Sequence, residues 1–246
     1  MYESDAEFEA RKQCDIAAMA ADAEFRELGR AWFTQSFRHR YSYNFRWMGL
    51  PIIQYPADIV AMQELIWQIK PRTIIETGVA RGGSLVFYAS MLELTGVQGT
   101  VIGVELALGD ENRAAITSHP LAHRIKLVDG SSIDEGTVGK VAELAGRDVP
   151  MLVVLDSHHG HDHVLAELRA YERFVQKDSY IVVFDTVIAH LPEDVLGDRP
   201  WGRGNNPKSA IDVFLAENKR FEVDSSYDDK LHLSVCPGGF LRCVRD

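Results

Sequence analysis

The densest group of chemically active side chains is a histidine cluster at residues 156–163 (DSHHGHDH), which holds four of the chain's nine histidines. Its spacing differs from the H-E-x-x-H pattern of zinc proteases, so it does not indicate that kind of site. Imidazole exchanges protons near neutral pH, and His158 or His159 could therefore accept a proton from a substrate hydroxyl. The structural alternative is that Asp162 caps the following helix and the histidines are solvated.

Each of five apolar runs in the central part of the chain ends in an acidic residue. These acids are Glu76, Glu105, Asp129, Asp156 and Asp185. In an open α/β sheet the carboxyl ends of the strands form the ligand crevice, where acids need hydroxyl, amine or cationic partners. Five in succession predict a site that binds such groups. Asp156 and Asp185 end consecutive runs, so together they could chelate a hard cation such as Mg²⁺.

A glycine-rich loop follows the first of these runs, at residues 76–84 (ETGVARGGS). Glycines there let the backbone approach a neighbour closely and turn into a helix. The pattern E-x-G-x-x-x-G is not the G-x-G-x-x-G loop that places a pyrophosphate on a helix N-terminus. It suits a ligand with an amino-acid tail and no phosphates. The residues expected to hold this tail are Glu76, Gly78, Arg81, Gly82 and Ser84.

The next two acids extend the predicted site toward a nucleoside. Glu105 lies 29 positions after Glu76, where an acid that binds ribose hydroxyls is expected. Asp129, Gly130 and Ser131 form a polar tip after the third run, suited to an adenine amine. Taken singly, each acid could equally be a solvated loop residue or a helix cap. Their shared register favours binding of a nucleoside cofactor.

The elements that must position these residues alternate between short apolar runs and helical stretches. The runs cover residues 73–76, 100–105, 124–129, 151–156 and 180–185. Nearly continuous apolar runs are typical of strands buried on both faces, and their alternation with helices predicts a doubly wound parallel sheet. Runs at 221–224, 231–235 and 240–244 have turns and no helix between them, which predicts an antiparallel finish.

The N-terminal residues 1–50 are predicted to form a helical extension of a main domain at 51–246. The segment 33–55 is rich in aromatic and basic residues. It could simply pack against the main domain, or it could form a lid or a substrate wall. An extension of this kind could also contact a second copy of the chain.

Charge and composition limit the kinds of binding partner that can be expected. The net charge is −10 and no cluster of Lys and Arg occurs, so a nucleic-acid surface is not expected. No apolar run approaches the roughly 20 residues that span a bilayer, and the acidic N-terminus does not resemble a signal peptide. The three cysteines lack metal or redox spacing, as expected in a reducing compartment. We therefore expect a cytoplasmic enzyme that acts on a small molecule.

Four strings occur in one order: IIQYPADI at 52–59, ETGVARGGS at 76–84, LDSHHGHDHV at 155–164 and RPWGRGNNPK at 199–208. Together they resemble the cephalosporin hydroxylase / rhamnosyl O-methyltransferase family, from Arg46 to the C-terminus. The resemblance implies a Rossmann-like class I methyltransferase fold, with a mostly parallel seven-stranded sheet and an antiparallel C-terminal hairpin. It also implies S-adenosylmethionine (SAM) as cofactor and a glycosylated natural product as acceptor.

The resemblance also implies roles for residues at the acidic edge. Asp156 and Asp185 would be Mg²⁺ ligands, with Asp156 also near the cofactor, and His159 would be the base. Phe184 stands where relatives have a glutamate, so water, substrate or His158 would complete the metal shell. The implied reaction is Mg²⁺-assisted O-methylation of a sugar hydroxyl, rhamnosyl-like, or of another natural product in secondary metabolism.

Other interpretations stay open. Asn205 and Asn206 could shape the acceptor pocket or be turn residues of a surface loop. The acceptor could be a β-lactam, with the chain acting as a methyltransferase or hydroxylation component. An NAD-dependent oxidoreductase is disfavoured by the absence of G-x-G and by the antiparallel finish. A silent cofactor-binding scaffold is disfavoured because Asp156 and His159 are intact.

Overall fold

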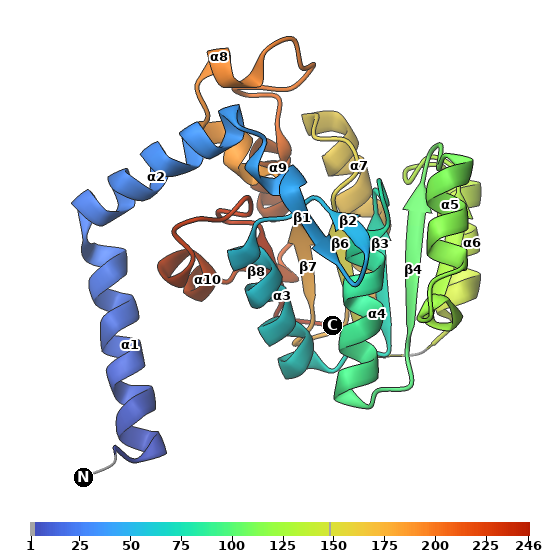
Figure 1. Ribbon diagram of the computed structural model, residues 1–246, viewed down its shortest axis with the longest axis horizontal. Helices are drawn as coiled ribbons and strands as arrows, with labels where there is room; N and C mark the ends of the chain where they lie inside the picture. The colour runs from blue at the N-terminus through green and yellow to red at the C-terminus, as the bar shows by residue number, and fades with distance from the viewer. Residues whose placement is uncertain (1–2, 148) are drawn as a thin grey trace.

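A seven-stranded sheet flanked by helices forms the centre of the protein (Figure 1), in a computed structural model that describes residues 3–147 and 149–246. The strand order is β5-β4-β3-β6-β7-β9-β8. The strands are β3 (Thr73–Thr77), β4 (Thr100–Glu105), β5 (Ile125–Asp129), β6 (Met151–Leu155), β7 (Tyr180–Val183), β8 (Phe221–Val223) and β9 (Phe240–Cys243). Strands β3 to β7 pair in parallel, whereas β9 is antiparallel to β7 and β8. The predicted Rossmann-like fold is confirmed.

Two hydrophobic cores lie on opposite faces of this sheet. Consecutive strand residues point to opposite faces, so Ile74 contributes to one core and Ile75 to the other. The first core includes residues of α3 (Pro56–Ile69), α4 (Gly83–Thr95) and α5 (Asp110–Thr117). The second includes residues of α6 (Glu135–Ala145), α7 (His161–Tyr171) and α9 (Pro207–Glu217). Burial on both faces explains why the strands read as almost continuous apolar runs.

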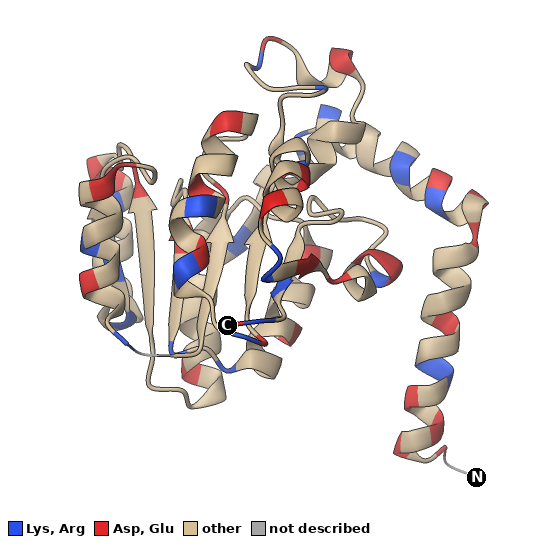
Figure 2. Ribbon diagram, turned by 180° about the vertical axis from the view of Figure 1, so that it is seen from behind, with Lys and Arg blue, Asp and Glu red and all other residues tan. Residues whose placement is uncertain are grey.

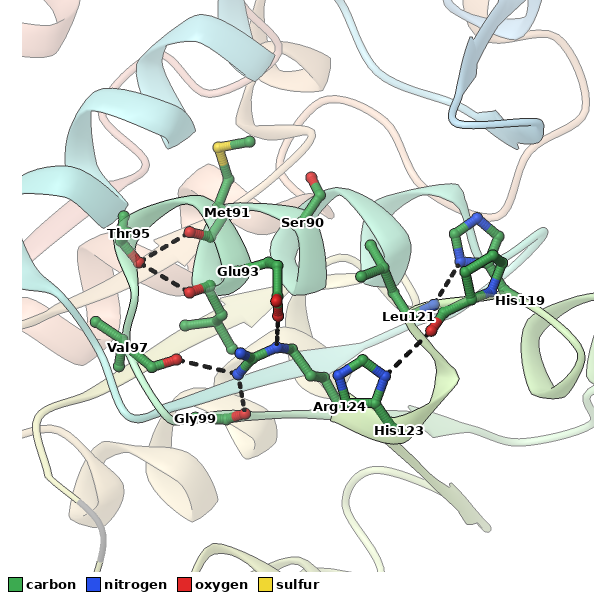
Figure 3. A network of polar contacts seen from close by, with 12 residues as sticks. Ser90, Met91, Glu93, Thr95, Val97, Gly99, His119, Leu121, His123 and Arg124 are labelled. Carbon is green, nitrogen blue, oxygen red and sulfur yellow. Dashed lines mark hydrogen bonds and ion pairs between the residues drawn. The ribbon is translucent and has the colours of Figure 1, made fainter.

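A buried arginine fixes the connection between α4 and β4 (Figure 3). Arg124 ends the short helix η2 (Ala122–Arg124), and its Nε lies 2.6 Å from Glu93 Oε2. Its Nη1 donates to the carbonyls of Val97 at 3.0 Å and Gly99 at 3.2 Å. A buried guanidinium is tolerated only when it is paired and hydrogen-bonded. Arg124 meets that condition and gives hydrogen-bond partners to two carbonyls of the loop between α4 and β4.

The C-terminal segment differs from the prediction in one respect. Helix α10 (Ser225–Lys230) lies between β8 and β9, and residues 231–235 do not form a strand. Asp224 caps α10 by accepting a hydrogen bond from the Ser226 backbone N–H at 3.1 Å. The backbone N–H of Val235 bonds to Asp58 Oδ2 at 3.0 Å, where a strand would need a ladder partner. Side-chain partners thus replace the expected strand pairing.

The N-terminal extension is helical but ends in a small hairpin. Helices α1 (Asp5–Ala21) and α2 (Ala23–Arg38) are followed by η1 (Tyr41–Asn44), β1 (Phe45–Trp47) and β2 (Leu50–Ile52). The helical prediction is therefore wrong for residues 45–50, where Met48 and Gly49 adopt positive φ and form the turn. Helix α1 extends away from the sheet (Figure 1), and both acidic and basic residues occur along it and α2 (Figure 2).

Three shorter helices complete the described chain: η3 (Glu172–Phe174), η4 (Thr186–His190) and α8 (Glu193–Leu196). Within residues 3–147 and 149–246, every helix is too short or too polar to cross a membrane.

Candidate active site

Three of the predicted site residues converge where β6 and β7 end. Asp156 directly follows β6, and Asp185 lies two positions beyond the neighbouring β7. His159 lies in the loop between β6 and α7. Each of the three offers one ligand atom, and these atoms lie within 4.8 Å of one another. His159 Nε2 is 3.2 Å from Asp185 Oδ2. The structure thus brings the two acids and the histidine into one group.

The backbone around these residues is held in uncommon conformations. Asp185 has a positive φ of 59°, a region that aspartate visits more readily than most residues and that often marks a functional turn. Gly78 has φ +88°, and a Cβ there would lie 2.1 Å from the carbonyl oxygen of Asp156. Only glycine fits this contact. Gly78 therefore serves the packing of two loops, which also fixes Asp156 beside the glycine loop.

Asp156 is held in a partly buried position close to the charge of Asp185. Burial, and then the charge of Asp185, hold the pKa of Asp156 well above its usual range. Gln54 opposes this shift, because its Nε2 donates to Asp156 Oδ2 at 3.1 Å. Two carboxylates crowded in this way are better satisfied by a cation than by water alone. The donor set, two carboxylates and one imidazole, fits a divalent metal ion.

Two cavities meet at this group. One, of about 350 Å³, lies under η1, η4 and α8, and the other, of about 220 Å³, lies along the glycine loop. Six residues line both: Tyr43, Ile53, Gln54, Asp156, His159 and Asp185. A molecule in either cavity would therefore contact the same acids and the same histidine. The arrangement can bring two different ligands together at one point.

Some of the glycine-loop residues line the smaller cavity, and others support the loop beside it. Gly78, Arg81 and Ser84 line the cavity. Glu76 is fully buried, accepts a hydrogen bond from Ser84 Oγ at 2.7 Å, and burial raises its pKa to about 8. Gly82 is the N-cap of α4, with φ +80°, and packs against the α5 side chain Ile116. These two residues lie beside the cavity without lining it.

The residues predicted for ribose and adenine lie farther along the same edge, after β4 and β5. Glu105 Oε2 accepts the backbone N–H groups of Val79 at 2.9 Å and Ala80 at 3.1 Å. Asp129 forms an ion pair with Arg113. Gly130 follows at φ +140°, and then Ser131. None of the predicted ribose and adenine residues lines either cavity, so the structure does not bring them to the group at Asp156.

The remaining histidines of the cluster have structural partners. His158 is exposed, and its Nδ1 accepts the Gly160 backbone N–H at 3.1 Å. His161 Nδ1 lies 2.8 Å from Ser209 Oγ, and His163 Nε2 lies 3.1 Å from Ser132 Oγ. Only His159 lines the two cavities. The alternative in which Asp162 caps α7 is wrong, because the cap is Gly160 and makes no side-chain bond.

Asn205 and Asn206 have structural roles. Asn206 caps α9 and accepts the Ser209 backbone N–H at 3.0 Å. Asn205 Oδ1 accepts the His161 backbone N–H at 2.8 Å. Neither asparagine lines the larger cavity. The turn interpretation therefore describes them better than the pocket interpretation.

Most of the larger cavity's wall comes from the segment before the sheet and from the loop after α8. Its aromatic lining residues are Phe37, Tyr41, Tyr43, Tyr55, Phe184 and Trp201. Trp201 contacts the His159 ring edge to face, with centroids 4.8 Å apart. Sequence reasoning raised a substrate wall for segment 33–55 but did not single out Gln54 or Trp201. Both lie in strings that carried the family resemblance, which was the available signal.

Comparison with known proteins identifies the family to which the chain is similar. The chain matches the family described as Rhamnosyl O-methyltransferase/CmcI over residues 39–244. The rhamnosyl O-methyltransferase of Mycobacterium tuberculosis is 28% identical over 201 residues, which cover 79% of this chain and 76% of that protein. A structure of CmcI with SAH has a TM-score of 0.59 at 22% identity, covering 81% of this chain and 82% of that chain. CmcI with Mg and SAM has a TM-score of 0.58 at 19% identity, covering 82% and 77%.

The two kinds of comparison support different statements. At these identities the likeness to the solved structures shows the shared fold. The family match extends from the end of α2 to the last residues of the chain and includes every residue of the acidic group. The chain therefore belongs to the rhamnosyl O-methyltransferase/CmcI family of SAM-dependent O-methyltransferases.

Proposed function

We propose that this chain transfers the methyl group of SAM to a hydroxyl oxygen of a sugar-bearing small molecule, with a divalent cation at Asp156 and Asp185. The observation that carries this proposal is the junction of the two cavities at Asp156, His159 and Asp185. A methyl donor in the smaller cavity and an acceptor in the larger one would meet there.

The donor would lie along the glycine loop. Gly78, Arg81 and Ser84 line the smaller cavity and would hold the methionine part, with Glu76 and Gly82 supporting the loop.

The nucleoside part of the donor would extend along the edge formed by β3, β4 and β5. Glu105 lies at this edge for the ribose, and Asp129, Gly130 and Ser131 lie there for the adenine. SAM supplies an electrophilic methyl group on a sulfonium.

The cation would rest on two protein carboxylates. Asp156 and Asp185 offer hard oxygen ligands, and Phe184 offers none, so water and the acceptor's own oxygens would fill the remaining positions. A bound divalent cation stabilises negative charge on an acceptor oxygen and lowers the pKa of its hydroxyl. Burial, followed by the charge of Asp185, raises the pKa of Asp156, and a bound cation would offset the cost of holding both carboxylates charged there.

The protein's own residues would move the proton and orient the acceptor. His159 lines both cavities, and we assign it as the base that accepts the hydroxyl proton. Asp185, 3.2 Å from His159 Nε2, would stabilise the imidazolium that results. The aromatic wall would hold a sugar ring while excluding water. Such positioning can contribute roughly 7–11 kcal/mol to lowering a barrier.

The acceptor class follows from the cavity and the relatives. A volume of about 350 Å³ accommodates a sugar ring with part of its aglycone, and aromatic side chains suit the apolar face of a sugar. The curated relatives are rhamnosyl O-methyltransferases. We therefore infer a glycosylated natural product as acceptor and place the reaction in secondary metabolism.

Chelator-treated enzyme, assayed by mass spectrometry against a panel of glycosides with neighbouring free hydroxyls, tests this function. The expected result is a product heavier by one methyl group that forms with Mg²⁺ and does not form without it. Full activity after removal of divalent metals would eliminate the cation from the proposal. Conversion of SAM to SAH without any methylated glycoside would contradict the acceptor class.

A further inference from the structure

Two arginines line the larger cavity but not the smaller one. Arg40 and Arg199 contribute to the wall of the larger cavity only, whereas Asp156 and Asp185 lie at the junction. The cavity therefore has acids where the methyl group would arrive and cationic groups elsewhere on its wall. With a divalent cation on the two aspartates, as proposed above, the lining would carry an excess of positive charge.

Arg40 is held in place by its backbone. It joins α2 to η1 in the left-handed region, with φ 51°, which is uncommon for a residue other than glycine. Its carbonyl accepts the Tyr43 backbone N–H at 3.0 Å and Asn44 Nδ2 at 3.1 Å. The guanidinium carbon lies 4.4 Å from the centroid of the Tyr43 ring, which also lines the cavity. This stacking orients the guanidinium without neutralising its charge.

Arg199 is also oriented without losing its charge. Its Nη1 donates to the Leu196 carbonyl at 3.0 Å, which ties it to the end of α8. A guanidinium has five N–H donors, so most of those on Arg199 stay available to a ligand. Trp201 follows two positions later on the same cavity wall.

Neither guanidinium is paired with an acid. Among the residues that the structure describes, no ion pair involves Arg40 or Arg199, although acids outnumber Lys and Arg in the chain by 36 to 26. The contrast with Arg38 is direct, since that arginine lies two residues before Arg40 and forms an ion pair with Asp194 of α8 at 2.6 Å. Oriented arginines without a carboxylate partner suit planar anionic groups such as phosphate and carboxylate.

We propose that the acceptor is an anionic glycoside. Its reacting hydroxyl would lie beside Asp156, Asp185 and His159, while a phosphate or carboxylate on the same molecule binds Arg40 and Arg199. The inference deepens the proposed function and rests on it for the place of the reacting hydroxyl. Specificity would arise because a neutral glycoside leaves both guanidiniums without a partner, and two charge-assisted contacts discriminate more strongly than the sugar ring alone.

Calorimetric titration of the full chain with SAH and Mg²⁺ present tests the inference without turnover. The probes are methyl glucoside, glucose 1-phosphate and methyl glucuronide, which share one ring and differ in charge. At least one anionic probe is expected to bind about tenfold or more tightly than methyl glucoside, in line with one hydrogen bond to a charged group. Comparison of the two anionic probes tells phosphate from carboxylate.

The variants Arg40→Gln and Arg199→Gln are each expected to reduce that preference, and the double variant to abolish it, with SAH affinity unchanged. Arg203→Gln is the matched control, because Arg203 is exposed, lies in the same loop as Arg199 and does not line the cavity. The inference is overturned if no anionic probe outcompetes methyl glucoside, if the double variant keeps the preference, or if Arg203→Gln lowers it equally. Failure of the proposed function would appear as absent methyl transfer, which this titration does not measure.

Discussion

Asp156→Asn is expected to lower kcat/KM for methyl transfer by about a thousandfold or more. Asparagine has nearly the same shape and can still accept the hydrogen bond from Gln54, but it removes one of two protein carboxylates from the proposed cation site. Stabilisation of charge by a metal ion is worth several kcal/mol, and about 1.4 kcal/mol corresponds to a factor of ten. Steady-state kinetics over a range of Mg²⁺ concentrations measure the loss.

The thermal stability of Asp156→Asn distinguishes loss of the carboxylate from misfolding of the variant. The folded-state pKa of Asp156 lies above its unfolded value, so ionisation of this group costs stability as the pH rises toward the folded pKa. A variant that cannot ionise avoids this cost, and metal-free Asp156→Asn should unfold at a temperature no lower than that of the metal-free parent. Asp162→Asn, in the exposed first turn of α7, is the matched control and should keep its activity. Comparable activity losses in both variants would contradict the assignment.

His159→Gln is expected to reduce kcat by at least about a hundredfold while leaving SAH affinity almost unchanged. Glutamine can hydrogen-bond near Asp185, but it cannot accept a proton near neutral pH. The measurement is a single-turnover assay combined with calorimetry of SAH. It separates loss of the chemical step from loss of binding.

The neighbouring histidine supplies the control for that experiment. His158 also contacts Trp201, with ring centroids 5.4 Å apart, yet it is exposed and lines neither cavity. His158→Gln should therefore stay within severalfold of the parent enzyme. Equal losses in the two variants would indicate that the turn, and not the His159 imidazole, supports activity.

Sequence periodicity predicts the sheet well because each strand is buried on both faces. The run at 100–105 matches β4 residue for residue, and the run at 151–156 exceeds β6 by one residue. The same reasoning fails at 231–235, where the Leu231 backbone N–H bonds to the Tyr227 carbonyl at the end of α10 and the Val235 backbone N–H bonds to the Asp58 side chain. Asp58 comes from a distant part of the chain, and no local pattern reveals such a partner.

Only part of the candidate site could be predicted from the sequence. The carboxyl ends of neighbouring parallel strands must lie at one edge, so the proximity of Asp156 and Asp185 could be predicted from order and period alone. The contributions of Gln54, Arg40 and Arg199 could not, because they depend on how the N-terminal segment and the loop after α8 fold over that edge. Family membership excludes the NAD-dependent alternative, whereas the roles of individual residues stay predictions.

The central claim is that the donor methyl group lies beside the acidic group, and paramagnetic relaxation tests it most directly. Mn²⁺ can replace Mg²⁺ at oxygen-rich sites, and SAM carrying ¹³C in its methyl group stays intact without an acceptor. With Mn²⁺ at Asp156 and Asp185, we expect strongly enhanced relaxation of the bound methyl signal, and no such enhancement in Asp156→Asn. Unchanged methyl relaxation in the parent protein, with both SAM and Mn²⁺ shown to be bound, would contradict the account.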